Sequence, residues 1–158
     1  MFEPGFSRRG KRLGPLPLQH SWALIEQPKR FELGAVLNSA AVDAVLPQTT
    51  GQIGALHSGC WECDLSDNSL IWSGGVFDLF GLPRDTCACR DTAVRMYAEH
   101  SRAKMEALRA HAIKHKRGFT LDIEIHPAIG SERWIRLIAA PVLEDGMVIK
   151  LHGLKVAV

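Results

Sequence analysis

The order of the secondary-structure elements expected between Gly59 and Val156 constrains this 158-residue chain most. Two short strand-like segments, GCWECDL and NSLIWS, come first, and Ser66-Asp67-Asn68 separates them. Short helical turns follow, and then one long basic helix from Arg102 to Lys116. Three alternating segments close the chain: FTLDIEIH, RWIRLIAAPV and MVIKLHGLKV. Strands on both sides of a helical middle predict an α+β domain with a five-stranded antiparallel sheet and helices on one face.

Composition favours one ordinary globular domain and argues against two classes of partner. The chain is 46% hydrophobic and 23% charged, which is enough for a core. Residues 1–30 contain six Lys/Arg and two Asp/Glu, a charge of +4, while the remainder contains thirteen and fifteen, a charge of −2. Nucleic-acid binding needs a basic stripe on the folded part, so none is expected. No apolar run approaches the ~18 residues that span a bilayer, so no membrane contact is expected.

The N-terminal third is expected to lie outside the main domain. Residues 1–30 combine prolines with a basic cluster and predict a flexible basic arm. Residues 31–54 predict an amphipathic helix and a linker, and residues 55–158 form the domain. The helical stripe must cover either the sheet or the same helix of a second subunit. We expect the second arrangement, a homodimer, with contact residues Leu33, Val36, Leu37, Ala40, Ala44 and, from the sheet, Trp61.

The helical middle and the strands suggest which side chains face inward. Ser101 is expected to be the N-cap of the long helix and Gly118 to follow its C-terminus. Asp145-Gly146 predicts a tight hairpin turn. Apolar residues at helical and alternating spacing are expected to line an interior that could enclose a small ligand: Phe77, Phe80, Met105, Leu108, Ala112, Ile123 and Ile125.

In two long segments the chain resembles a PAS domain of the kind found in bacterial sensor proteins. In GCWECDLSDNSLIWSGGVFDLFGLP, a Gly and a Trp open the first strand, and an acidic turn, a Trp-Ser pair and a short helix ending in Leu-Phe-Gly follow. In GFTLDIEIHPAIGSERWIRLIAAPVLEDGMVIKLHGL, an alternating strand, a turn and an Arg-Trp pair precede two further strands. The resemblance covers about residues 55–156. It implies a PAS-like fold and a sensory role.

The sequence departs from the PAS pattern at three places. At the start of the long helix, 98–102 retain only the final Arg of the usual motif, and Gly153-Leu154-Lys155-Val156 replaces the usual exit toward a kinase or cyclase. We therefore expect action in trans on a separate signalling protein. The segment 85–90 does not match the Asn-Cys-Arg motif of flavin-binding relatives, so flavin is not expected.

Cysteines and histidines offer an alternative function as a metal- or heme-binding sensor. Cys60-Trp61-Glu62-Cys63 and Cys87-Ala88-Cys89 could supply four zinc thiolates. However, residues three apart on a strand point to opposite faces, which favours buried thiols. Four cysteines without a secretory signal also indicate a reducing, cytoplasmic location. His111 and His115 are the heme-ligand candidates on the long helix, although a surface position is favoured.

No catalytic residue set emerges from the sequence. Asp122 and Glu124 share a strand face, but cross-strand ion pairs with Arg133 or Arg136 explain them better than catalysis. The sequence therefore predicts a non-enzymatic sensory module that binds a small ligand or a protein partner. No cofactor is required, and a kinase or cyclase is the expected signalling partner.

Overall fold

The computed structural model describes residues 17–31 and 58–158. The expected N-terminal amphipathic helix lies outside these residues. The described elements, in chain order, are β1 (Gln19–Trp22), η1 (Leu24–Glu26), α1 (Gln27–Arg30), β2 (Ser58–Asp64), β3 (Leu70–Trp72), α4 (Gly74–Phe80), α5 (Arg90–Arg95), α6 (Glu99–His115), β4 (Gly118–Ile125), β5 (Arg133–Glu144) and β6 (Met147–Ala157).

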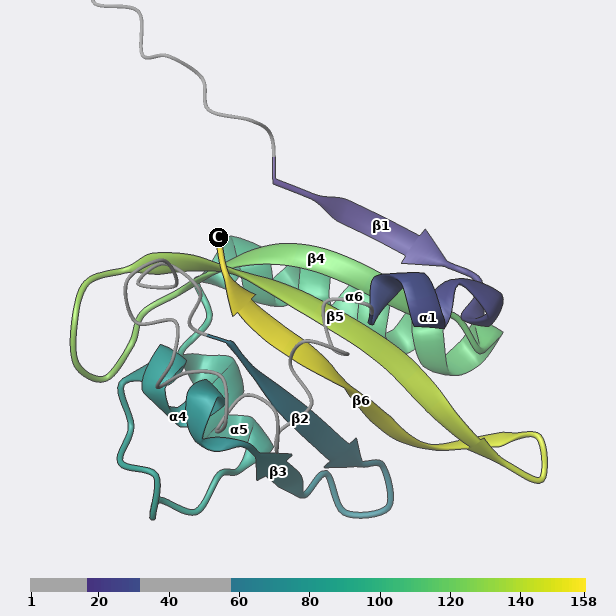
Figure 1. The fold of residues 1–158 in the computed structure, drawn as a ribbon, viewed down its shortest axis with the longest axis horizontal. Helices are drawn as coiled ribbons and strands as arrows, with labels where there is room; N and C mark the ends of the chain where they lie inside the picture. The colour runs from purple at the N-terminus through teal and green to yellow at the C-terminus, as the bar shows by residue number, and fades with distance from the viewer. Residues whose placement is uncertain (1–16, 32–57) are drawn as a thin grey trace, which may run out of the picture.

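The α+β class with an antiparallel sheet is confirmed, but the sheet has six strands rather than five. Their order is β1-β4-β5-β6-β2-β3, and every neighbouring pair is antiparallel. The additional strand, β1, extends the β4 edge (Figure 1). Residues 19–30 thus form a strand and two short helical segments, which differs from the expectation of a flexible arm reaching residue 30.

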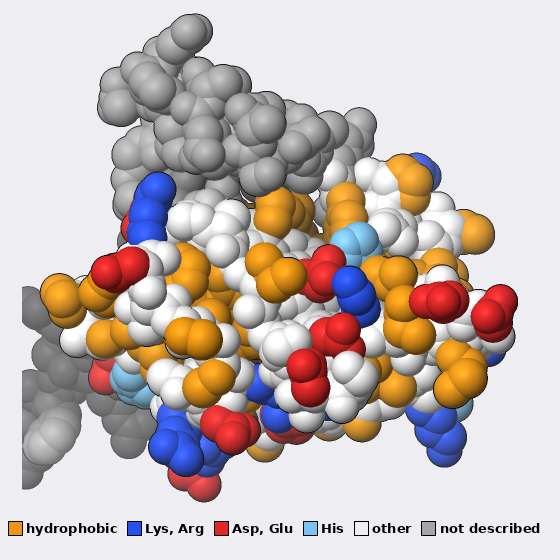
Figure 2. All heavy atoms as spheres, turned by 90° about the horizontal axis from the view of Figure 1, so that it is seen from below, with side chains coloured by type: hydrophobic (Ala, Val, Ile, Leu, Met, Phe, Trp, Pro, Cys, Tyr) orange, Lys and Arg blue, Asp and Glu red, His pale blue; other side chains and the backbone are white. Residues whose placement is uncertain are grey.

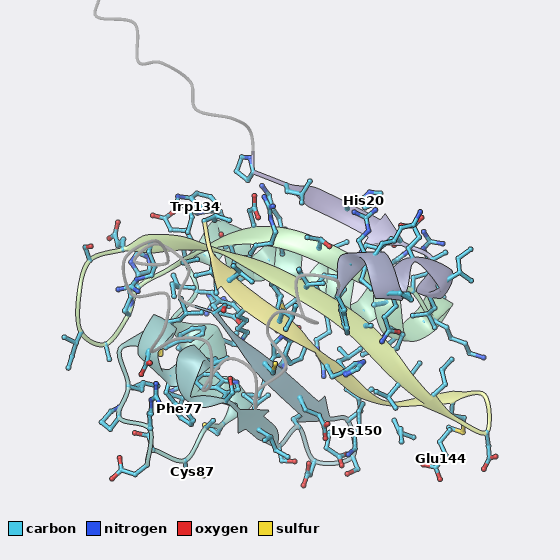
Figure 3. All side chains as sticks on the ribbon, viewed as in Figure 1. His20, Phe77, Cys87, Trp134, Glu144 and Lys150 are labelled. Carbon is cyan, nitrogen blue, oxygen red and sulfur yellow. The ribbon has the colours of Figure 1, made fainter. Side chains whose placement is uncertain are left out.

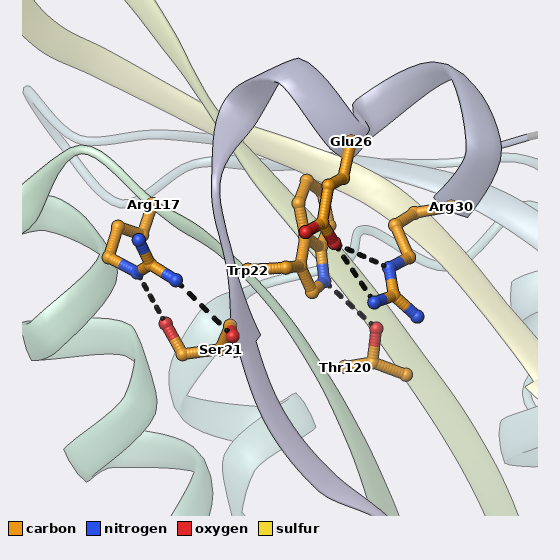
Figure 4. A network of polar contacts seen from close by, with 6 residues as sticks. All are labelled: Ser21, Trp22, Glu26, Arg30, Arg117 and Thr120. Atoms are coloured by element: carbon orange, nitrogen blue, oxygen red, sulfur yellow. Dashed lines mark hydrogen bonds and ion pairs between the residues drawn. The ribbon is translucent and has the colours of Figure 1, made fainter.

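Side-chain contacts hold β1 against β4. The Trp22 indole Nε1 donates to Thr120 Oγ1 at 3.0 Å, and Arg117 Nε donates to Ser21 Oγ at 3.0 Å (Figure 4). Opposite Trp22 in the register stands Gly118. A Cβ atom at Gly118 would lie 2.2 Å from the Trp22 ring. Glycine at this position therefore makes the space that the buried Trp22 ring occupies.

Alternation along β5 divides the apolar side chains between the two faces of the sheet. Ile135 and Leu137 belong to the main core with α4, α5 and α6. Ile138 and Ala140 point the other way and pack in a second cluster with Trp22. Figure 1 shows α1 in front of the sheet and α6 behind it. The expectation of helices on one face is therefore corrected, because η1 and α1 cover part of the other face.

The structure confirms the expected hairpin turn but not the expected caps of the long helix. The Asp145-Gly146 turn is confirmed, with φ of 50° and 76°, and it joins β5 to β6. The expected caps of α6 are wrong. Its N-cap is Ala98, and its C-cap is Lys116 in the left-handed region with φ of 54°. Ser101 lies inside the first turn, where its Oγ accepts a hydrogen bond from the Glu124 backbone N–H at 2.9 Å and so fastens α6 to β4.

Ion pairs connect β4 to β5 and to α6. The expected pair between Asp122 and Arg136 is present, with Arg136 Nε donating to Asp122 Oδ1 at 2.8 Å. Glu124 differs from the expectation, since its carboxylate lies 3.4 Å from His100 Nε2. Figure 2 shows acidic and basic side chains interspersed among apolar ones on the face seen from below. Within the described residues, no helix has the length and apolar character to cross a membrane.

Candidate functional site

A small cavity lies between the helices and the core-facing side of the sheet. Its volume is about 50 Å³. A cavity of this size has room for a few water-sized groups. Residues from β2, β3, β4, β5, β6, α5, α6 and the segment after α5 contribute to its wall: Trp61, Cys63, Leu70, Arg90, Ala93, Val94, Tyr97, Met105, Arg109, Phe119, Leu137, Leu151 and Lys155.

The most unusual residue in this wall is Lys155, whose relative exposure is only 4%. Its Nζ donates a hydrogen bond to Tyr97 Oη at 3.1 Å. Four aromatic rings surround the amine. The distances from Nζ to the ring centroids are 4.9 Å for Phe80, 5.0 Å for Trp72, and 5.6 Å for both Trp61 and Tyr97. These distances are within the range of cation–π attraction, so the rings stabilise the protonated amine in part.

Strand register brings these groups together. On β6, Lys155 lies four residues after the core residue Leu151, so the two side chains share a face of the sheet. Trp61 of β2 is paired with Gly153 of β6 on one side and with Trp72 of β3 on the other. A Cβ atom at Gly153 would lie 1.8 Å from the Ile138 carbonyl oxygen, so glycine there lets β5 and β6 approach closely. Register therefore places one amine among indole rings from two neighbouring strands.

Burial dominates the electrostatics of the cavity. Loss of solvation lowers the pKa of Lys155 to about 7, and the nearby Cys63 opposes this shift. Burial also raises the pKa of the Tyr97 phenol well above its usual range. The pKa of the Cys63 thiol is raised by burial, although Arg109 and Arg90 act in the opposite direction. Near neutral pH the phenol and the thiol are therefore uncharged, whereas the Lys155 amine titrates between its protonated and neutral forms.

Hydrogen-bond donors around the amine are incompletely satisfied. The Nε1 atoms of Trp61 and Trp72 are buried and have no hydrogen-bond partner in the structure. Within residues 17–31 and 58–158, no carboxylate forms an ion pair with Lys155, while Arg90 is paired with Glu106. A buried polar group without a protein partner either lowers the stability of the fold or bonds to a water or a ligand. The cavity can thus accept a group that supplies hydrogen-bond acceptors.

The expected pocket residues lie in the core, but only one of them lines this cavity. Met105 is part of the wall, and Phe80 approaches it through the ring that covers Lys155 Nζ. Five others pack elsewhere in or against the same core: Phe77, Leu108, Ala112, Ile123 and Ile125. The sequence reasoning missed Lys155 and Tyr97, and it considered Cys63 only as a zinc ligand or a buried thiol. The period of two residues along β6 could have revealed Lys155, because it puts this side chain on the same buried face as Leu151.

The expected dimer contacts are placed only in part. Leu33, Val36, Leu37, Ala40 and Ala44 lie outside the described residues. Trp61, by contrast, is 9% exposed and lines the cavity from within the monomer. Its ring is therefore a component of the candidate site, which does not fit the expected role at a subunit surface.

The four cysteines do not converge. Cys63 packs in the main core and Cys60 against the cluster on the other face, which confirms that the pair points to opposite faces. Cys87 and Cys89 are exposed, and Figure 3 places Cys87 on the loop between α4 and α5, at the edge of the molecule. In the described part of the chain, no three His, Cys, Asp or Glu side chains form a metal-binding group.

The two long-helix histidines face away from the cavity. Both His111 and His115 are exposed, as the favoured interpretation of the sequence predicts. Their ring centroids lie 4.5 Å apart on the outside of α6. Neither side chain is therefore placed to ligate a heme in the interior of this structure.

Comparison with known proteins identifies the fold. No protein-family model matches the chain, and no curated protein does. The solved structures that are similar include the N-terminal PAS/PAC sensor domain of a diguanylate cyclase from Marinobacter aquaeolei. It has 15% identity and a TM-score of 0.57, and the match covers 62% of this chain and 92% of that one.

Two further structures extend the comparison. A sensory box histidine kinase/response regulator from Burkholderia thailandensis has 16% identity and a TM-score of 0.56, with 73% of this chain and 82% of that one covered. An RNA-binding light-oxygen-voltage receptor has 14% identity and a TM-score of 0.57, with 64% of this chain covered. The match spans only 29% of that receptor's own length. The described chain therefore has the PAS fold, as the resemblance in its sequence implied.

The cavity is too small for a flavin. Sites for cofactor-sized ligands usually occupy about 300 Å³ or more, whereas this cavity measures about 50 Å³. The Trp61 ring and the Lys155 side chain occupy the interior. We therefore assign no flavin chemistry to this site.

Proposed function

We propose that this chain is a non-enzymatic sensory module that binds a small ligand in the cavity around Lys155. The observation that carries the proposal is a group of buried, incompletely paired donors. Among the described residues, Lys155 Nζ has no carboxylate partner, and the indole N–H groups of Trp61 and Trp72 have no acceptor. Such groups lower the stability of the empty domain. A ligand that satisfies them would stabilise the arrangement to which it binds.

The ligand would act through the sheet. Lys155 lies on β6 between Leu137 of β5 and Gly59 of β2. A ligand that draws Lys155 Nζ away from Tyr97 would therefore affect the central strand and the segment that joins α5 to α6. The domain would then shift between two populated arrangements according to the ligand's affinity for each.

The response would be passed to a separate signalling protein. Two structures of similar fold come from a diguanylate cyclase and from a histidine kinase/response regulator, and these suggest a cyclase or kinase as the partner. A cytoplasmic location belongs to the same proposal. So does the absence of catalysis, because the described cavity wall holds no histidine or carboxylate to activate a nucleophile.

Native mass spectrometry of the full chain purified from its own cells tests the ligand proposal. We expect a retained small molecule, released on denaturation, in addition to the mass of the protein. The same sample after unfolding, dialysis and refolding is the control and should lack it. If the freshly purified protein carries no molecule and none of a broad metabolite library alters its melting temperature, the proposal is wrong.

A homodimer formed through the N-terminal region is the second part of the proposal. Removing residues 1–50 should convert a dimer into a monomer in light scattering, because the apolar stripe of 33–44 would be lost. This deletion also removes β1 and α1, so the deciding variant changes the stripe alone. Replacing Leu33 and Leu37 by Asp in the full chain is the milder control and should have the same effect. If both variants have the mass of a dimer, the proposed dimer contact is wrong.

A further inference from the structure

The cavity wall is rich in donors and poor in acceptors. Among the described residues, its polar side chains are one amine, two guanidinium groups, one indole, one phenol and one thiol, with no carboxylate. Arg90 is neutralised by Glu106, and Arg109 donates to the uncharged Asn68 amide at 3.0 Å. Positive charge without a described counter-charge therefore remains at Lys155 and Arg109. A cationic ligand would be repelled, and a neutral one would leave this charge uncompensated.

Trp61 adds an independent indication of a ligand. Its side chain is more than nine-tenths buried, lines the cavity and carries an Nε1–H without an acceptor. An indole nitrogen only donates, so a ligand atom or a water that bonds to it must accept. The same requirement holds for the protonated Lys155 amine, which has three donors and, in residues 17–31 and 58–158, only the Tyr97 oxygen as a hydrogen-bond partner.

Cavity size limits the ligand. About one water fits in each 10–15 Å³ of such a volume, so about 50 Å³ accommodates roughly four non-hydrogen atoms. The rest of the wall is apolar and includes Met105, Phe119 and Leu151. A planar acceptor group with a short apolar tail matches both the size and the lining.

We infer that the ligand of this cavity is a short-chain monocarboxylate whose carboxylate is held by the Lys155 ammonium and the Trp61 indole N–H. This inference rests on the proposed ligand-binding function and names the chemical class of its ligand. One carboxylate oxygen would replace the missing counter-charge of Lys155, and the methyl or ethyl group would contact the apolar wall. Phosphate has no apolar group to contact that part of the wall.

Binding would be coupled to protonation of Lys155. The titratable and charged groups that face it are Cys63 from β2, Tyr97 after α5, Arg90 from α5, and Arg109 and Glu106 from α6. Burial keeps Cys63 and Tyr97 protonated near neutral pH. The empty site holds Lys155 with a pKa of about 7. Acetate stays ionised above pH 6, so only the protonation of the amine should govern its affinity in this range.

Indole resonances provide a direct readout. We would titrate the ¹⁵N-labelled full chain with acetate and propionate at constant ionic strength, and with acetamide and inorganic phosphate as comparison probes. A ligand of four or five atoms binds with a dissociation constant of about 0.1 mM or weaker, which suits this experiment. The Trp61 indole signal should shift as its N–H gains an acceptor. The Trp22 signal should not, because Trp22 already donates to Thr120.

Variants distinguish the proposed contacts from unspecific effects. K155M should lose acetate binding by at least tenfold, whereas K150M, the same change at the exposed end of the same strand, should retain it. W61F removes one N–H and keeps most of the ring, so its affinity should fall about three- to tenfold. For the unmodified chain, affinity should fall about tenfold between pH 8 and pH 9, since the protonated fraction of Lys155 falls by that factor.

Each other outcome overturns the inference. It is wrong if acetamide binds as tightly as acetate, if phosphate binds and the carboxylates do not, or if K155M and W61F both retain the affinity. It is also wrong if no probe shifts the Trp61 signal. The proposed sensory function fails separately, only if native mass spectrometry and the metabolite library find no ligand of any class.

Discussion

Replacing Lys155 by Met should stabilise the empty domain. Burial lowers the pKa of this lysine from 10.5 to about 7. Each pKa unit corresponds to about 1.4 kcal/mol, so at pH 7 the buried amine costs about 4 kcal/mol of folding free energy. Met fills a similar volume but leaves the Tyr97 hydroxyl without its partner, which costs about 1–3 kcal/mol. We therefore expect K155M to raise the free energy of unfolding by about 1–3 kcal/mol at pH 7.

The pH dependence of this gain identifies its cause. Because the folded-state pKa is depressed, the unfolded chain binds the Lys155 proton between about pH 7 and pH 10.5 while the folded chain does not. The unmodified protein should therefore gain stability as pH rises through this window. The cost of the amine falls from about 4 kcal/mol at pH 7 to about 2 kcal/mol at pH 9. The advantage of K155M should shrink by about 2 kcal/mol over the same interval.

Urea unfolding followed by tryptophan fluorescence at pH 7, 8 and 9 measures both quantities. K150M is the matched control. Its lysine is held protonated by Glu62, with a raised pKa, so its effect should not change over this range. If K155M is destabilising at pH 7, or if its difference from the unmodified chain is the same at all three pH values, the buried amine is not titrating as argued.

Further substitutions test the packing of β1 against β4 and the cross-strand ion pairs of the sheet. G118A should destabilise the domain by about 1–3 kcal/mol, because its Cβ would overlap the Trp22 ring. In urea unfolding, the same substitution made together with W22A should cost less. Equal losses with and without W22A would contradict the steric explanation. D122N should cost about 1–2 kcal/mol, since it weakens two hydrogen bonds from Arg136 on a largely buried carboxylate. E62Q breaks a more exposed pair with Lys150 and should cost less; a loss as large as that of D122N would refute the role of burial.

Local patterns in the sequence predicted much of the strand and turn structure. The alternation of Leu121, Ile123 and Ile125 placed them on the buried face of β4, where the structure has them. Asp145-Gly146 predicted the β5–β6 turn because a two-residue hairpin needs positive φ, which these residues tolerate. Such features depend on residues that are close in sequence. The caps of α6 were not predictable in the same way, because Ser101 bonds to Glu124 of β4 rather than to its own helix.

The candidate site was predictable only in outline. Sequence order and motif resemblance by themselves determined a PAS-type α+β sheet with an apolar interior. The period of two along 147–157 also puts Lys155 on the same face as Leu151, but the predicted site did not include it. Only the tertiary structure decided that β1 adds a sixth strand, that Trp61 and Trp72 stand beside the amine, and that Tyr97 is its hydrogen-bond partner. The physical reason is that side-chain direction has a period of two residues and is local, whereas the neighbours of a buried charge come from strands and helices far apart in the chain.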